Sequence, residues 1–237
     1  MVDIDNVIRL TNRIKELRTL CFGDGNTLIN AYHWDIKKDL RITSIKRLTR
    51  LIIGLNISFL YLSNSDQNKV LESVRLSFEE RIDIEQYLIW NEVFLKTGFA
   101  SSLFFIVERV LKDYLQFLDE ETYKHTKGIK NICNCLLEEQ LEWDIVKFDC
   151  SAFDFLRLIR NTLHSNGIHL PVSTKDKEVS IVYKGKMYEF KEGERINFVT
   201  WDLLLDITND MRELLFHIAN NKTVREITSL IPDTFAF

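Results

Sequence analysis

The chain has 237 residues, of which 46% are hydrophobic, and this length fits one large helical domain or two small ones with ample side chains for a core. Its formal net charge of -4 creates no global attraction to nucleic acid, so such binding requires a local basic face. The longest apolar run, residues 51–62, is interrupted by Gly54 and Asn56 and is shorter than the ~18 residues of a membrane span, which favours a buried helix.

The cysteines and the first residues bear on the compartment. The four cysteines lack the dense, regular spacing of a secreted disulfide scaffold. The start, MVDIDN, carries acidic residues where a signal peptide has basic ones followed by an apolar run. We therefore expect reduced thiols and a cytoplasmic location.

Helices are predicted along most of the first half of the chain, because only two prolines occur and proline is the residue that most firmly stops a helix. Apolar residues at helical spacing predict helices over 4–20, 42–62, 79–95 and 99–118, the last as the central core helix. The sequence FGDGN at 22–26 predicts a turn, SNSDQN at 63–68 predicts a polar loop, and Gly98 separates the last two helices.

A basic segment, KHTKGIKN at 124–131, is broken by Gly128. This composition fits a solvated surface loop, which we favour, or a loop beside a ligand. Two further helices are predicted over 129–140 and 151–166.

The periodicity changes after Pro171. Two short β-prone runs, 179–183 and 186–190, flank Lys184 and Gly185, which is the pattern of a two-residue hairpin turn. Thr200 then stands at the N-cap position of a long helix, and a short last helix is predicted over 223–231. The sequence therefore predicts an all-α protein, a single helical domain over 1–237 with a small β-hairpin insertion at about 172–198.

A polar stripe is the strongest functional signal. Arg157, Arg160, Asn161 and His164 follow the i, i+3, i+4, i+7 spacing and share one face of the helix predicted over 151–166. Arginine binds phosphate bidentately and stabilises charge that develops during phosphoryl transfer, while histidine transfers protons. The stripe itself carries no carboxylate, so these residues do not suggest a metal-bound hydrolytic centre.

The segment RNTLH at 160–164, followed by Ser165, Asn166 and Gly167, resembles the signature helix of the HEPN superfamily. That family's motif is an arginine, usually followed by a polar residue, and a histidine after four to six intervening positions. Here three residues separate Arg160 from His164. Six separate Arg157 from His164, but a leucine then occupies the polar position.

The resemblance implies a HEPN-like helical bundle, commonly a homodimer, with metal-independent endoribonuclease activity in a toxin–antitoxin, antiphage-defence or RNA-processing setting. It implies single-stranded RNA as substrate, no cofactor, and a protein antitoxin or defence-system protein as partner. His164 would act as general base or acid, Arg160 or Arg157 would stabilise the phosphate, and Asn161 would orient either. Phe153, one turn before the stripe, is expected at an interface.

Other readings stay open. An exposed helix face with two arginines, an asparagine and a histidine is common, and the pattern alone is weak. A catalytically inactive HEPN-like module that binds RNA or a protein is the alternative, and an unrelated helical interaction protein is the third. No zinc site is expected, because the C-x-C at Cys133 and Cys135 with lone Cys150 and His125 lacks paired spacing. No phosphate loop, GxSxG or HExxH sequence occurs.

Overall fold

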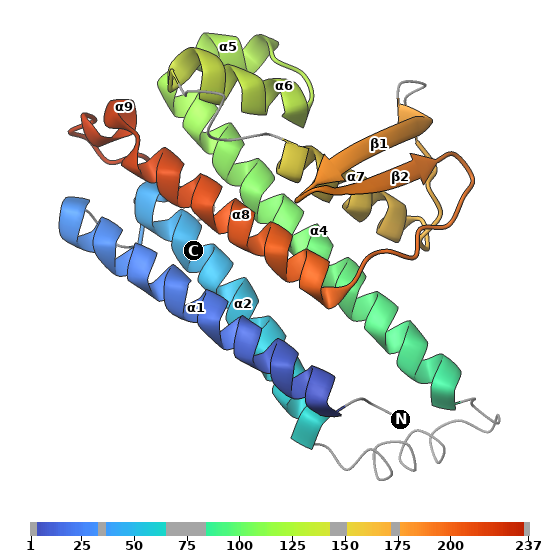
Figure 1. Cartoon of the computed structure of the whole chain (residues 1–237). Helices are drawn as coiled ribbons and strands as arrows, with labels where there is room; N and C mark the ends of the chain where they lie inside the picture. Colours follow the sequence, from blue (N-terminus) through green and yellow to red (C-terminus); the bar gives the residue numbers. More distant parts are fainter. Residues whose placement is uncertain (1–3, 33–36, 65–83, 143–150, 172–175, 235–237) are drawn as a thin grey trace.

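The computed structural model describes residues 4–32, 37–64, 84–142, 151–171 and 176–234. Four long helices build the body of the molecule (Figure 1), and a small hairpin lies at its side. Helix α1 packs along α2, α8 lies against both, and α4 contacts α2 and α8. The predicted all-α bundle with a small hairpin is confirmed. The four helices are α1 (Ile4–Tyr32), α2 (Leu40–Asn64), α4 (Ile84–Leu118) and α8 (Trp201–Asn220).

Two helices continue through glycines at which the sequence predicts a turn or a break. Helix α1 runs through Gly23 and Gly25, and α4 runs through Gly98, so both predictions are wrong. A glycine inside a helix costs ~1 kcal/mol, whereas each core side chain buried on folding contributes ~1.5–3 kcal/mol. Cys21 and Leu28, on either side of the α1 glycines, are fully buried. Packing therefore outweighs the local preference for a turn.

The loop predicted at 63–68 and the helix predicted over 79–95 lie partly outside the described residues. Residues 63–64 belong to α2 rather than to the predicted loop, and residues 65–68 lie outside the described residues. Residues 79–83 of the next predicted helix also lie outside them.

Short helices follow α4 at one end of the bundle (Figure 1). Helix α5 (Glu120–His125) leads through a short loop to α6 (Ile129–Asn134), which continues as the π-helix η1 (Cys135–Gln140). The helix predicted over 129–140 is thus confirmed, although its second half has the wider π geometry. Gly128 has a φ of 83°, a left-handed conformation that favours glycine, and it begins α6.

The last helix of the chain is shorter than its sequence predicts, since α9 spans only Lys222–Arg225. The buried guanidinium of Arg41 donates to the carbonyls of Ile227 and Ser229, both at or below 3.0 Å. Its charge is balanced by Asp39, also fully buried, at 2.6 Å. Carbonyls that accept from a buried arginine do not need helical N–H partners, so the chain leaves the helix after its first turn.

The predicted hairpin is confirmed as β1 (Glu178–Tyr183) and β2 (Lys186–Lys191), paired antiparallel. Lys184 and Gly185 form the turn with φ of 48° and 76°, as a two-residue hairpin with the native twist requires. The hairpin covers α7 (Ser151–His164), which packs on α4 and α8. Four aromatic rings surround Phe155 of α7 at centroid distances of 4.8 to 6.3 Å: Tyr183, Tyr188, Phe190 and Phe198.

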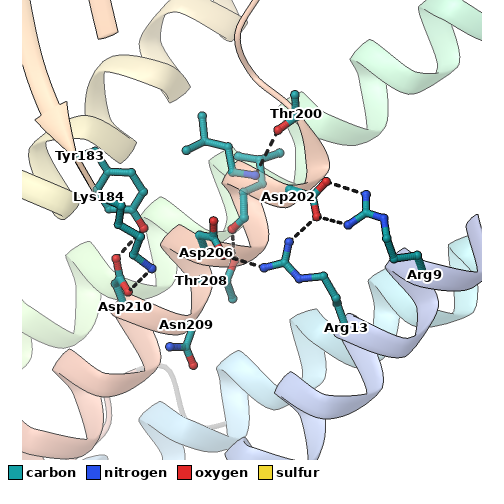
Figure 2. A network of polar contacts seen from close by, with 12 residues as sticks. Arg9, Arg13, Tyr183, Lys184, Thr200, Asp202, Asp206, Thr208, Asn209 and Asp210 are labelled. Carbon is teal, nitrogen blue, oxygen red and sulfur yellow. Dashed lines mark hydrogen bonds and ion pairs between the residues drawn. The ribbon is translucent and has the colours of Figure 1, made fainter. Parts of the chain in front are cut away.

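Carboxylates on one side of α8 fasten α1 to it (Figure 2). Thr200 caps α8 by accepting a hydrogen bond from the N–H of Leu203, as predicted. Asp202 accepts two hydrogen bonds of 2.6 Å from Arg9 and a further one from Arg13. Hydrogen bonding to Arg9, and then to Arg13, lowers the pKa of Asp202 to about 2, although partial burial acts in the opposite direction.

The same face of α8 also holds the hairpin. Asp210 accepts a hydrogen bond from the Tyr183 hydroxyl and forms an ion pair of 3.0 Å with Lys184 (Figure 2). Burial, followed by the hydrogen bond to Asp210, raises the pKa of Tyr183 far above its ordinary value, so the phenol stays a donor. Further along, Arg212 pairs with Asp24 of α1. Helix α8 is thus bonded both to α1 and to the hairpin.

Candidate functional site

Helix α7 is strongly amphipathic and carries the predicted polar stripe on the side away from the core. Its apolar stripe is buried against α4, α8 and the hairpin, including Leu156, Ile159 and Leu163. His164 is the last helical residue, and the N–H of Gly167 donates to the carbonyl of Thr162 at 2.9 Å. Gly167 has a φ of 80°, which confirms the left-handed residue predicted to end the helix.

Arg157 is already engaged by two carboxylates. Its Nε lies 2.7 Å from Asp154 one turn earlier, and its Nη1 lies 3.1 Å from Asp176, which precedes β1. Burial alone lowers the pKa of Arg157, but the hydrogen bonds with Asp154 and Asp176 outweigh it, so the pKa lies above its ordinary value. The spacing of Asp154 from Arg157, three residues, places that carboxylate beside the stripe by the same helical rule. This carboxylate was not among the residues predicted for the site.

Arg160 is held in place without an ion pair among the described residues. Its Nη1 donates to Asn161 Oδ1 at 2.9 Å, and its guanidinium carbon lies 5.6 Å from the centroid of the Phe104 ring on α4. Its Nε is buried and has no hydrogen-bond partner within the described part of the chain. The ring and the amide fix the plane of the guanidinium, and its Nη2 has no hydrogen-bond partner among the described residues.

His164 lies one turn beyond Arg160, and its side chain is exposed. Within the described ranges no hydrogen bond or ion pair engages its imidazole, and Asn161 is exposed beside it. The structure therefore places Arg160, Asn161 and His164 together on the outer face of α7, with Arg157 bound to Asp154 and Asp176 at the start of that face. We name Arg160, Asn161 and His164 the α7 triad.

Two rings near the stripe, those of Phe153 and His169, are buried. Phe153, predicted at an interface, is 2% exposed and stacks on Phe104 with ring centroids 5.3 Å apart, so that prediction is wrong. His169 is buried, and its ring nitrogens contact Thr162 Oγ1 at 3.1 Å and the carbonyl of Asp176 at 2.6 Å. It therefore braces the loop that carries the partner of Arg157. A histidine close to a helix cap was the only sequence signal for this role.

A pocket of about 380 Å³ opens beside the start of α7, between α6 and β1. Of the four predicted site residues only Arg157 lines it, together with Lys130 from the basic segment 124–131. Only the end of that segment borders the pocket, at Ile129 and Lys130, which lie in α6 rather than in a loop.

The described residues show neither a metal site nor a membrane-spanning helix. Among them, no group of three or more histidine, cysteine, aspartate or glutamate side chains is arranged to hold a metal ion. Cys21 and Cys135 are free thiols, and burial, as the largest cause, raises the pKa of Cys21 to about 12. None of the helices in the described part of the chain combines the length and apolar character needed to cross a membrane.

Comparison of the chain with family models, with curated proteins and with solved structures gave no significant match.

Proposed function

We propose that this chain is a HEPN-like, metal-independent endoribonuclease whose α7 triad contacts single-stranded RNA. The observation that carries the proposal is the exposed imidazole of His164 one turn from the fixed guanidinium of Arg160, with no carboxylate bound to either among the described residues. A cation left unneutralised beside an accessible base is the minimum that phosphoryl transfer needs from protein side chains.

In the proposed reaction the ribose 2′-oxygen attacks the adjacent phosphorus and the bond from phosphorus to the 5′-oxygen breaks. The products are a 2′,3′-cyclic phosphate and a 5′-hydroxyl end. His164 accepts the proton of the 2′-hydroxyl, and Arg160 donates hydrogen bonds to the non-bridging oxygens as their charge develops. Asn161 keeps Arg160 in position. We assign Arg160 rather than Arg157 because both polar edges of Arg157 face aspartates.

The leaving 5′-oxygen also needs a proton, and one triad supplies a single histidine. We therefore propose a homodimer in which the triad of a second copy faces the first and supplies that proton. A cytoplasmic location, a toxin or antiphage-defence setting and a protein antitoxin or defence partner remain part of the proposal and rest on the family resemblance.

A second candidate function is favoured by one observation, the neutralisation of Arg157 by Asp154 and Asp176. With one cation removed from the stripe, the remaining face fits a catalytically inactive HEPN-like module that binds RNA or a protein.

Cleavage of labelled single-stranded RNA in EDTA separates the two candidates. We expect cyclic-phosphate ends from the native chain, and a loss of about 10²–10⁴-fold in rate for His164→Ala. Arg160→Ala should lose cleavage as well, and Arg160→Lys, which keeps the charge without the planar fork, should recover only a small part. RNA with a 2′-deoxy nucleotide at the scissile position should stay intact.

The matched control is His217→Ala, which removes another exposed histidine from the last turn of a helix, α8. This variant should cleave as the native chain does. Binding of RNA by the native chain without cleavage would support the inactive module. Equal loss in His217→Ala would show that the effect is not specific to the α7 triad and would contradict the proposal.

A further inference from the structure

The hairpin has an open edge. Tyr183 and Lys186 flank the two-residue turn and therefore form a hydrogen-bonded pair, and the N–H of Glu192 donates to the carbonyl of Lys177 at 2.8 Å in the same alternation. Between these two pairs, hydrogen-bonded and non-hydrogen-bonded residue pairs alternate along the hairpin. The backbone N–H and C=O groups of two residues in β1, Ser180 and Val182, thus point away from β2. Within the described residues β1 pairs with β2 alone.

The pocket lies at this open edge. Its wall on the hairpin side consists of Ser180, Ile181 and Val182, three consecutive residues whose side chains alternate between the two faces of the strand. Consecutive residues can line one pocket only where it touches the edge of the strand rather than one face. Opposite this edge the lining combines the apolar side chains of Ile129 and Phe153 with charged ones, among them Lys130. A volume of about 380 Å³ accommodates a large side chain of a peptide that runs along β1.

The edge lacks most of the features that usually block strand addition, and Glu178 at its first position is the one charged residue of β1. Proteins protect edge strands with lysine, proline, bulges or very short length. The six residues of β1 contain no lysine or proline, and the register runs without a bulge. On its outer face, Val182 and Met187 lie opposite each other and are 65% and 62% exposed. A third strand would therefore meet apolar side chains on this face as well as at the pocket.

Lysines near the pocket indicate which charge a bound side chain would carry. Lys130 is 66% exposed and lies 3.8 Å from Asp154, a distance at which the pair is weak. Asp154 is more closely bound to Arg157, at 2.7 Å. Lys127, in the loop before α6, is exposed and has no ion pair among the described residues. The α6 side of the pocket is therefore basic and complements an acidic side chain.

We propose that the open edge of β1 binds an extended peptide of a partner protein as a third strand, with an apolar side chain in the pocket and an acidic one beside Lys130. Backbone hydrogen bonds to Ser180 and Val182 supply affinity, and the pocket and Lys130 supply specificity. This binding site is separate from the α7 triad and does not depend on ribonuclease activity. A nucleic acid has no alternating N–H and C=O groups to match the edge.

The probe is a fluorescein-labelled seven-residue peptide, Thr-Val-Thr-Leu-Thr-Asp-Thr, capped at both ends and titrated against the full chain by fluorescence anisotropy. We expect a dissociation constant on the order of 10–100 µM. The same peptide with N-methyl groups on alternate amides, which removes strand pairing along one edge, should bind at least about tenfold more weakly. Replacement of its aspartate by lysine should also weaken binding.

Two proline variants form a matched pair. Val182→Pro removes the N–H that faces the pocket without removing a hydrogen bond of the hairpin, and Met187→Pro does the same at the opposite residue, where the N–H faces the other edge. Val182→Pro should lose peptide binding, and Met187→Pro should keep it. Circular dichroism and the melting temperature verify that both variants fold.

Lys130→Glu should weaken peptide binding about tenfold. Its control is Lys222→Glu on α9, at a side chain that is 88% exposed, and this variant should bind the peptide as the native chain does.

Hydrogen exchange measured by NMR gives an independent readout. The amides of Ser180 and Val182 should exchange rapidly in the free chain and slowly with the peptide bound, while the amide of Ile181 stays protected throughout.

Equal peptide binding by Val182→Pro and the native chain would overturn the proposal. Protection of Val182 that grows with protein concentration in the absence of peptide would overturn it too, by assigning the edge to a second copy. RNA that competes with the peptide would assign the pocket to nucleic acid instead.

Discussion

Helices α7 and α8 carry polar stripes of similar spacing and use them differently. On α8, Asp202, Asp206 and Asp210 follow one another every four residues, and each is bonded to a side chain of α1 or the hairpin (Figure 2). On α7, only Arg157 at the start of the stripe is bonded to another element, while Arg160 and His164 have no ion pair within the described part of the chain.

The difference follows from what covers each helix. Helix α8 runs between α1 and the hairpin, so its polar residues meet charged partners on both sides. Helix α7 is covered by α4, α8 and the hairpin on its apolar side, and its outer face is left to solvent. A polar stripe between packed elements becomes part of their interface, and a stripe beyond the packing remains accessible to a ligand. The next four experiments test this contrast.

The largest loss of stability is expected on the α8 side from Asp24→Ala. Arg212 and Asp24 are only 10% and 15% exposed, so the variant leaves a guanidinium largely buried without its main partner. We expect a loss of about 2–3 kcal/mol in the free energy of unfolding, measured by urea titration. The control is Glu213→Ala, whose carboxylate is 48% exposed and pairs with the same arginine, and which should cost less than about 1 kcal/mol. Equal losses would contradict the burial argument.

On α7 the corresponding variant is Arg157→Ala. We expect a loss of about 1–2 kcal/mol, because Asp154 and Asp176 are 19% and 28% exposed and keep part of their hydration when the guanidinium is removed. Ribonuclease activity should persist, since this guanidinium is already bound to carboxylates. Thermal unfolding and the RNA cleavage assay on one protein preparation test both parts. If the variant keeps its stability and loses RNA cleavage, Arg157 belongs to the catalytic site and the assignment of Arg160 alone is contradicted.

Acid should act on the α8 face through Asp202. The folded pKa of about 2 lies below the ordinary 3.8, so the carboxylate stabilises the fold above pH ~4 and this contribution is lost as the pH falls toward 2. Since Asp202 is 38% exposed, the contribution should stay below about 1 kcal/mol. In Asp202→Asn, unfolding free energy should vary less over this range than in the native chain. Glu226→Gln, at a 68% exposed carboxylate, is the control and should retain the native slope.

The smallest change in stability is expected from His164→Gln. The imidazole is exposed and has no hydrogen-bond partner among the described residues, so the unfolding free energy should stay within about 0.5 kcal/mol of the native value. RNA cleavage should nevertheless be lost. A destabilisation well above this value would show that His164 is a structural residue and would remove the contrast between the two helices.

Local patterns in the sequence predicted the elements with local causes. Helical periodicity located the main helices, Thr200 marked the start of α8, and Lys184 with Gly185 marked the hairpin turn. The stripe on α7 was also predicted, because residues three, four and seven apart share a helix face in any context. These features depend on residues within one or two turns of each other.

Tertiary contacts decided the rest. Gly23 and Gly98 stay helical because the surrounding side chains are buried between helices. The last helix ends early because Arg41, far away in sequence, donates to the backbone carbonyl of Ile227 just after it. Asp176, 19 residues from Arg157, engages one cation of the stripe and leaves Arg160 to the proposed site. Helical spacing alone indicates which residues share a face, but packing brings together partners that lie far apart in the chain and so settles which of those residues are bonded.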